Sequence, residues 1–297
     1  LLKMTCFYPP PSLFTSLCNG LIVLSPEMVG MLSLSPPYNI FTFHIFSCYN
    51  TLVMIKFLGL CVQNLIRSLK YLFSGQVRMD SIINQAVAIS YDSIPISLII
   101  AFIAAAVIAI QVAKQFLMSG AEAYIGGTIA IVMIREIAPG FVALSIGARA
   151  GTAISAEIAN MQVTSQVDAM KTLKVDPVGY YFTPRLIAAA VTVPMVVLLA
   201  EIVGIWGGLF VSKLTIGLHP DRYMYSVWAW LATKDIYISL LKAAIFGLLI
   251  ALVCATQGYE TKGGAKEVGT STTQAAILST VYMLFADFII NLIFYIG

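Results

Sequence analysis

Charged side chains occur inside stretches of this chain that are otherwise apolar, and these residues are the best candidates for chemistry. They are Arg135, Glu136, Glu201, Lys242 and Asp287. A charge near the centre of a bilayer costs at least about 2.5–3.5 kcal/mol on insertion scales, so such residues usually pair or face a polar cavity. Two interpretations stay open: some of them line a polar site within the membrane, or they are structural pairs, such as Glu136 with Lys242, that lock a helix bundle.

The composition requires that these residues sit in a membrane protein. Of 297 residues, 59% are hydrophobic and 10% are charged, whereas a soluble domain carries about 25% charged residues. Several apolar runs reach the length of about 20 residues that crosses a bilayer as a helix. A β-barrel would instead show alternating segments of about ten residues. The net charge of +3, with no basic cluster, gives no sign of a nucleic-acid partner.

Hydropathy predicts five membrane spans joined by short connections. They cover residues 94–117, 124–148, 184–211, 236–256 and 274–296. Pro139 is expected to kink the second span, because proline removes a backbone hydrogen bond. Before the spans, residues 55–75 show apolar residues at helical spacing with Lys56, Arg67 and Lys70 on another face, which is typical of an interfacial helix. We expect residues 54–297 to form a single domain.

Residues 1–53 differ from the rest of the chain. They are rich in proline, serine and aromatic residues, and prolines break their apolar runs before these reach spanning length. Met54 is a plausible true start of the protein. We therefore expect 1–53 to be a disordered or non-native extension, with an extra membrane anchor as the alternative.

The sequence lacks the motifs of disulfide-rich proteins, metal sites, nucleotide-binding loops and hydrolases. The five cysteines show no C-x-x-C spacing, and His44 and His219 have no neighbours at ligand spacing, so we expect no disulfide framework and no metal site. No G-x-x-x-x-G-K-[ST] sequence is present to cradle ATP phosphates. H-E-x-x-H and G-x-S-x-G are also absent, and we expect no catalytic residues and no enzyme activity.

The stretch EIANMQVTSQVDAMKTLKVDP, residues 157–177, interrupts the apolar pattern between spans two and three. Ser165 and Asp168 have the spacing of a capping box, and Asp176-Pro177 is expected to end the short helix. Its apolar face is expected to hold Val163, Val167, Met170 and Leu173 or Lys174. Lysines in the 157–181 and 257–272 loops favour these loops as cytoplasmic. The helix either receives force from a soluble partner or is an ordinary interfacial loop helix.

Several segments together resemble the MlaE permease family over about residues 55–297. They are REIAP at 135–139, GARAGTAISAEI at 147–158, MQVTSQVDA at 161–169, DP at 176–177, PR at 184–185, GYETKGGA at 258–265 and DF at 287–288. Members of this family are membrane subunits of ABC transporters that work with MCE-domain proteins and move phospholipid or related lipids across the bacterial envelope; a plastid branch also exists.

The resemblance implies a fold, partners and site residues. It implies an all-α polytopic protein with an N-terminal interfacial helix, five transmembrane helices and a cytoplasmic coupling helix at 157–173. ATP would be bound and hydrolysed on a separate ATPase subunit, with no cofactor in this chain. The ATPase contact would include Glu157, Met161, Gln166 and Asp168. A lipid cavity at the axis of a homodimer would be lined by residues from the charged set, namely Arg135, Glu136, Lys242 and Asp287.

Two further function classes compete with an ABC permease subunit. A stand-alone secondary carrier or channel would also use intramembrane charges, but the chain shows no internal repeat and five spans do not divide into equal halves. An intramembrane enzyme has no supporting motif. We expect the protein in a bacterial inner membrane, with the plastid inner envelope as the alternative.

Overall fold

The computed structural model describes residues 39–73 and 79–296, and within these ranges the chain forms helices joined by short turns. The chain divides into two compact units, residues 1–59 and 60–297, and the description below concerns the second. The helix α3, Asn39–Phe73, begins before Met54. The predictions for residues 1–38 lie outside the described residues.

Five helical segments are long and apolar enough to cross a membrane, which confirms the predicted all-α polytopic fold. They are Met79–Met118, Glu122–Val163, Pro177–Ile216, Thr233–Tyr259 and Ala265–Phe294. Each extends past its predicted bounds at one or both ends, because polar residues continue the helices beyond their apolar centres. The first segment, for example, adds α4 (Met79–Ser90) before α5 (Ile94–Met118).

The second segment is one continuous rod made of several helical pieces. These are η2 (Glu122–Tyr124), α6 (Ile125–Val132), η3 (Met133–Ile137), α7 (Ala138–Ile146), η4 (Gly147–Gly151) and α8 (Thr152–Val163). Both η3 and η4 are π-helical. Single π turns widen a helix locally and occur often at functional sites. Pro139 lies in the first turn of α7, directly after η3.

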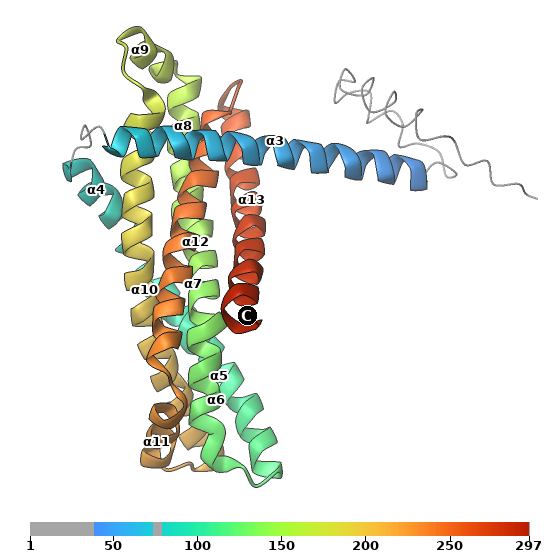
Figure 1. Cartoon of the computed structure of the whole chain (residues 1–297), viewed down its shortest axis with the longest axis vertical. Helices are drawn as coiled ribbons and strands as arrows, with labels where there is room; N and C mark the ends of the chain where they lie inside the picture. The colour runs from blue at the N-terminus through green and yellow to red at the C-terminus, as the bar shows by residue number, and fades with distance from the viewer. Residues whose placement is uncertain (1–38, 74–78, 297) are drawn as a thin grey trace, which may run out of the picture. The chain divides into compact units, whose positions relative to one another are not determined.

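The later spans pack around α12, Thr233–Tyr259, which is the most buried of the five. It lies between α10 (Pro177–Ile216) and α13 (Ala265–Asn291), as Figure 1 shows, and also contacts α8 and α7. The last segment ends in the π-helix η5, Leu292–Ile296. A Cβ on Gly258 would lie 2.6 Å from the Ser155 carbonyl, so this glycine lets α12 and α8 approach closely.

Two pairs of glycines, Gly147 with Gly151 and Gly204 with Gly208, lie where helices of this chain pack together. A Cβ on Gly151 would lie 2.9 Å from Cys254 Sγ, and one on Gly204 would collide with the Met133 side chain. A Cβ on Gly208 would lie 2.7 Å from the Tyr223 hydroxyl, whereas one on Gly147 would meet Ile250 at an ordinary contact distance of 3.6 Å. The pairs therefore fit the tight packing that small residues permit between membrane helices.

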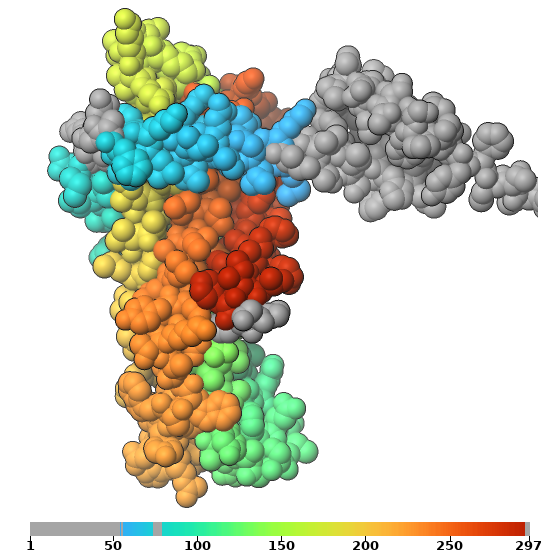
Figure 2. All heavy atoms as spheres, in the orientation of Figure 1, coloured from blue at the N-terminus to red at the C-terminus, as the bar shows by residue number. Residues whose placement is uncertain are grey.

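Two short helices lie at opposite ends of the bundle (Figure 1). The helix α9, Gln166–Thr172, follows the second span, and Figure 2 shows it projecting beyond the packed spans. The helix α11, Pro220–Trp230, connects the third and fourth spans. The connection between α12 and α13 lies at the α9 end (Figure 1), so the two loops expected to be cytoplasmic share one end of the bundle.

Candidate charged site within the spans

The ammonium group of Lys242, on α12, is the centre of a charged cluster. Its side chain is 0% exposed. Its Nζ lies 2.9 Å from Asp287 Oδ1 on α13, 3.1 Å from Glu136 Oε1 on η3, and donates to the Arg135 carbonyl at 2.8 Å. An ammonium carries three protons, and a buried charge is tolerated when it is both paired and hydrogen-bonded. Three separate spans therefore meet at one lysine.

The local backbone explains why the Arg135 carbonyl can serve this lysine. In an α-helix that carbonyl would accept a hydrogen bond from the backbone N–H of the residue four positions later, and here that residue is Pro139. Proline has no N–H to donate. The π turn of η3 covers the same residues, and the carbonyl accepts the Lys242 proton. Pro139 thus frees the carbonyl that helps to position the cluster.

Further polar side chains extend the cluster along α12. Asp235 Oδ1 accepts from Arg135 Nε at 2.9 Å, with the Asp235 side chain only 3% exposed. Ser239 Oγ donates to Glu201 Oε1 at 2.5 Å, and both residues are buried. Asp235, Ser239 and Lys242 are spaced four and three residues apart, which places them on one face of the helix. That face carries a continuous polar stripe into the bundle.

The cluster reaches the surface of the chain on the side of η3 and α13. The Glu136 side chain is 43% exposed and that of Asp287 is 25% exposed. Asn291, one helical turn after Asp287, donates to Glu136 Oε2 at 3.2 Å. Charges that face acyl chains are unfavourable, so this surface faces a polar space or a further chain. Apolar side chains of α13 surround it, including exposed Leu284, Phe285 and Phe288.

The α9 end is built differently from the prediction. The chain from Glu157 to Leu173 forms two helices, because α8 continues to Val163 and α9 begins at Gln166. Ser165 between them has a φ of 58° and makes no side-chain cap, while Asp168 pairs with Lys171 at 2.9 Å. The predicted capping box is therefore wrong. The Asp168 carboxylate, as a hydrogen-bond acceptor, raises the pKa of Lys171.

The Asp-Pro step also has a different role from the predicted one. The short helix ends at Thr172, and Lys174 follows with a φ of 58°. Asp176 instead caps the next helix, since its Oδ1 accepts from the Val178 N–H at 3.1 Å, and Pro177 fills the first helical position. Proline is favoured there because its N–H would have no helical partner anyway.

The four residues expected at the ATPase contact fall into two groups. Gln166 and Asp168 are exposed on α9. Met161 lies half-buried on α8, and Glu157 on the same helix makes an ion pair of 2.6 Å with Arg185 of α10. Of the predicted apolar face, Val167 is buried, whereas Leu173 is 75% exposed.

Comparison with known proteins adds to this geometry. The family model described as "Permease MlaE" matches residues 82–293. The chain belongs to the MlaE permease family. It is 36% identical over 214 residues to a "Probable ABC transporter permease protein" of Rickettsia felis, covering 72% of this chain and 83% of that protein.

Other relatives come from photosynthetic organisms. A probable ABC transporter permease protein of Synechocystis is 34% identical over 227 residues, or 76% of this chain and 86% of the relative. The chloroplastic protein TRIGALACTOSYLDIACYLGLYCEROL 1 of Arabidopsis thaliana is 34% identical over 188 residues, or 63% of this chain and 54% of the relative. The chain is a multi-pass membrane permease subunit of the ABC transporter type, and such a permease works with an ATPase.

The MlaE-family permease brings together most of the charges that its sequence singled out. Lys242, Glu136 and Asp287 are in direct contact, and Arg135 joins them through its carbonyl. The sequence prediction missed Asp235, which lies just before the predicted fourth span, and Asn291, four residues after Asp287. Helical spacing from Lys242 and Asp287 would have indicated both. Among the described side chains, no group of three or more His, Cys, Asp or Glu could hold a metal ion.

Proposed function

We propose that this permease moves phospholipid or a related lipid between the membrane and an MCE-domain partner, driven by a separate ATPase subunit. The observation that supports this most is the cluster around Lys242, which combines a buried ammonium with partly exposed carboxylates inside the spans. A lipid headgroup carries a phosphate that an ammonium can bind.

The geometry suggests how a headgroup would use the cluster. Lys242 is neutralised in this structure by Glu136 and Asp287. A phosphate that reaches Lys242 would replace one of these carboxylates, and the released carboxylate could then face the ammonium of a zwitterionic headgroup. The exposed apolar side chains of α13 beside the cluster would contact the acyl chains.

A homodimer would complete this site. The α13 span is the least buried of the five, and the charges beside it are exposed on the isolated chain. Charged groups in the membrane face the interior of a bundle or a water-filled cavity. Two copies that meet near η3 and α13 would enclose such a cavity at their axis.

The ATPase would bind at the α9 end. The helix α9 projects beyond the spans with its Gln166 and Asp168 side chains exposed, and Val167 holds it against the chain. This end would then be cytoplasmic, in agreement with its lysines. We place the protein in a bacterial inner membrane, with the plastid inner envelope as the alternative.

Reconstitution tests this function directly. The full chain is expressed with the ATPase and MCE-domain subunits of the same organism and placed in liposomes that contain fluorescent phosphatidylethanolamine. ATP should drive transfer of labelled lipid to or from the MCE-domain protein, and a non-hydrolysable ATP analogue should not. ATP hydrolysis without any lipid transfer would contradict the proposed substrate.

A further inference from the structure

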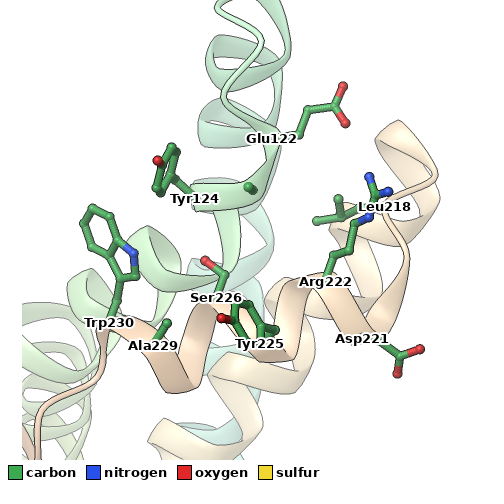
Figure 3. Close-up of a pocket in the computed structure, with 10 residues that line it drawn as sticks. Glu122, Tyr124, Leu218, Asp221, Arg222, Tyr225, Ser226, Ala229 and Trp230 are labelled. Atoms are coloured by element: carbon green, nitrogen blue, oxygen red, sulfur yellow. The ribbon is translucent and has the colours of Figure 1, made fainter.

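A pocket with charged and aromatic side chains in its wall lies at the opposite end of the bundle from α9 (Figure 1). It is a cavity of about 560 Å³ between η2, the connection from α10 to α11, and α11. Its lining residues, most of them labelled in Figure 3, are Glu122, Ala123, Tyr124, Leu218, Asp221, Arg222, Tyr225, Ser226, Ala229 and Trp230. None of them belongs to the Lys242 cluster.

The pocket is preformed, because α11 is fixed tightly to the second and third spans. Ser226 Oγ accepts from the Gly127 N–H at 2.9 Å, and Tyr223 is buried and donates to the Ile205 carbonyl at 3.2 Å. A Cβ on Gly126 would collide with the Tyr223 carbonyl, so the backbones are in close contact. The walls of the pocket therefore do not depend on a mobile loop.

Aromatic side chains place this pocket at the level of lipid headgroups. Tyr225, Trp228 and Tyr237 are each at least 70% exposed, and Tyr124 is 48% exposed. Tyrosine and tryptophan gather at membrane–water interfaces, where their rings meet both apolar and polar surroundings. An occupant of this pocket would therefore be bound beside the membrane surface.

The charges of the pocket suit a zwitterion that contains phosphate. In the part of the chain that the structure describes, the Arg222 guanidinium and the Glu122 carboxylate make no hydrogen bond or ion pair. Guanidinium groups bind phosphate with two parallel hydrogen bonds. Glu122 supplies negative charge for an ammonium group, whereas Asp221 lies 3.2 Å from His219 and points away from the pocket in Figure 3.

The remaining wall suits the glycerol and the first acyl carbons of a lipid. The rings of Tyr124 and Trp230 meet edge to face with centroids 5.5 Å apart. They lie toward one end of the pocket, and Glu122 and Arg222 lie toward the other (Figure 3). Leu218 and Ala229 add apolar surface. A ligand with a charged head and an apolar continuation would contact both ends.

We infer that this pocket binds the headgroup of a zwitterionic glycerophospholipid, with the phosphate on Arg222, at the face opposite the ATPase-binding end. The inference rests on the proposed function, because it adds a loading or release site to a lipid pathway through the spans. The shared chemistry is a phosphate anion, so free phosphate is the competing source.

The chain contains a natural reporter for this site. Of its three tryptophans, Trp206 and Trp228 do not line the pocket, whereas Trp230 does. The full-length chain with Trp206→Phe and Trp228→Phe is purified in detergent, and Trp230 fluorescence is followed during titration. The titrants are dihexanoylphosphatidylethanolamine, dihexanoylphosphatidylglycerol, dihexanoylglycerol and inorganic phosphate.

We expect saturable binding of dihexanoylphosphatidylethanolamine. Dihexanoylphosphatidylglycerol, dihexanoylglycerol and inorganic phosphate should each bind more weakly. Arg222→Gln should lower the affinity for the ethanolamine lipid by at least about tenfold, because the substitution removes a charge-assisted contact. The matched control Lys213→Gln, which removes an exposed cation at the same end outside the pocket, should not. Equal binding of dihexanoylglycerol, or an unchanged affinity in Arg222→Gln, would overturn the phosphate assignment.

Two further outcomes decide the source and the headgroup. Inorganic phosphate that binds as tightly as the ethanolamine lipid would overturn the lipid assignment, and equal binding of phosphatidylglycerol would overturn the preference for a zwitterion. The titration uses no ATPase and no turnover, so it is independent of the transfer assay. If the lipid does not bind in the titration but ATP-driven transfer occurs, the pocket assignment alone is rejected. If the lipid binds but no transfer occurs, the proposed function alone is rejected.

Discussion

The Glu157 carboxylate lies 2.6 Å from a terminal nitrogen of the Arg185 guanidinium, and this ion pair joins the end of the second span to the start of the third. The Arg185 side chain is only 4% exposed, whereas that of Glu157 is 54% exposed. Gln85 of α4 accepts from Arg185 Nε at 3.4 Å. The other terminal nitrogen, Nη1, has no partner among the described residues. Three helices near the α9 end therefore depend on one buried guanidinium.

Removing Glu157 should destabilise the bundle more than removing an exposed acid. Glu157→Ala leaves the buried Arg185 charge without its carboxylate, and we expect a loss of about 1–3 kcal/mol, less than for a fully buried pair because Glu157 is half-exposed. Asp168→Ala removes an exposed pair on α9 and should cost about 0.2–0.5 kcal/mol. Thermal unfolding in detergent compares the two variants. Equal melting temperatures would show that the Glu157 pair contributes no more than a surface pair.

Reversing the charge on α9 should disrupt the ATPase complex without unfolding the permease. Asp168 is exposed and pairs only with Lys171 among the described residues, so Asp168→Arg should leave the bundle intact. We expect native mass spectrometry to detect two permeases with two ATPases for the wild type, and to lose the ATPases in this variant.

The matched control for α9 makes the same change at the other end of the bundle. Asp221→Arg reverses a carboxylate that is 90% exposed on α11. This variant should keep the ATPases. An Asp168→Arg variant that also keeps them would mean that α9 is an ordinary connecting helix.

A single methyl group should separate α12 from α8. Gly258→Ala places a Cβ 2.6 Å from the Ser155 carbonyl oxygen, where the backbone must shift. Overpacking of this kind costs about 1–3 kcal/mol. Gly140 offers the control, because a Cβ there meets nothing within 4 Å, and alanine is the better helix former. We expect a lower melting temperature for Gly258→Ala and an unchanged or higher one for Gly140→Ala; the reverse order would contradict this packing.

The sequence predicted the parts of this protein that depend on hydrophobic patterning. Five spans and the charged residues within them follow from the cost of exposing charge to hydrocarbon. The contact between Glu136 and Lys242, which the sequence suggested as a pair, is present at 3.1 Å. The same pair can lock the bundle and line a lipid pathway, so the contact alone does not choose between these roles.

Local motifs failed where tertiary contacts decide the backbone. Ser165 has the spacing of a capping residue, yet α8 continues to Val163, and Ser165 takes a left-handed conformation without a side-chain cap. The helix α11 was not predicted, because Pro220, Asp221 and Arg222 suggest a loop when its packing against the second span is unknown. Leu173 fits an apolar face by spacing but is exposed, because α9 projects beyond the spans.

The most direct test asks whether the Lys242–Asp287 pair does more than hold three spans together. The double variant Lys242→Met/Asp287→Leu replaces the ammonium and its nearest carboxylate with apolar side chains, and replacing both members of a buried pair together often preserves stability. The remaining carboxylate, Glu136, is 43% exposed and keeps its hydrogen bond from Asn291. Lys234→Met, at the exposed start of α12, is the control. ATP-driven lipid transfer is measured in liposomes for both. We expect the double variant to assemble with the ATPase and to transfer lipid at least about tenfold more slowly than the wild type, while Lys234→Met keeps the wild-type rate. Wild-type transfer by the folded double variant would contradict a role for this cluster in lipid transport.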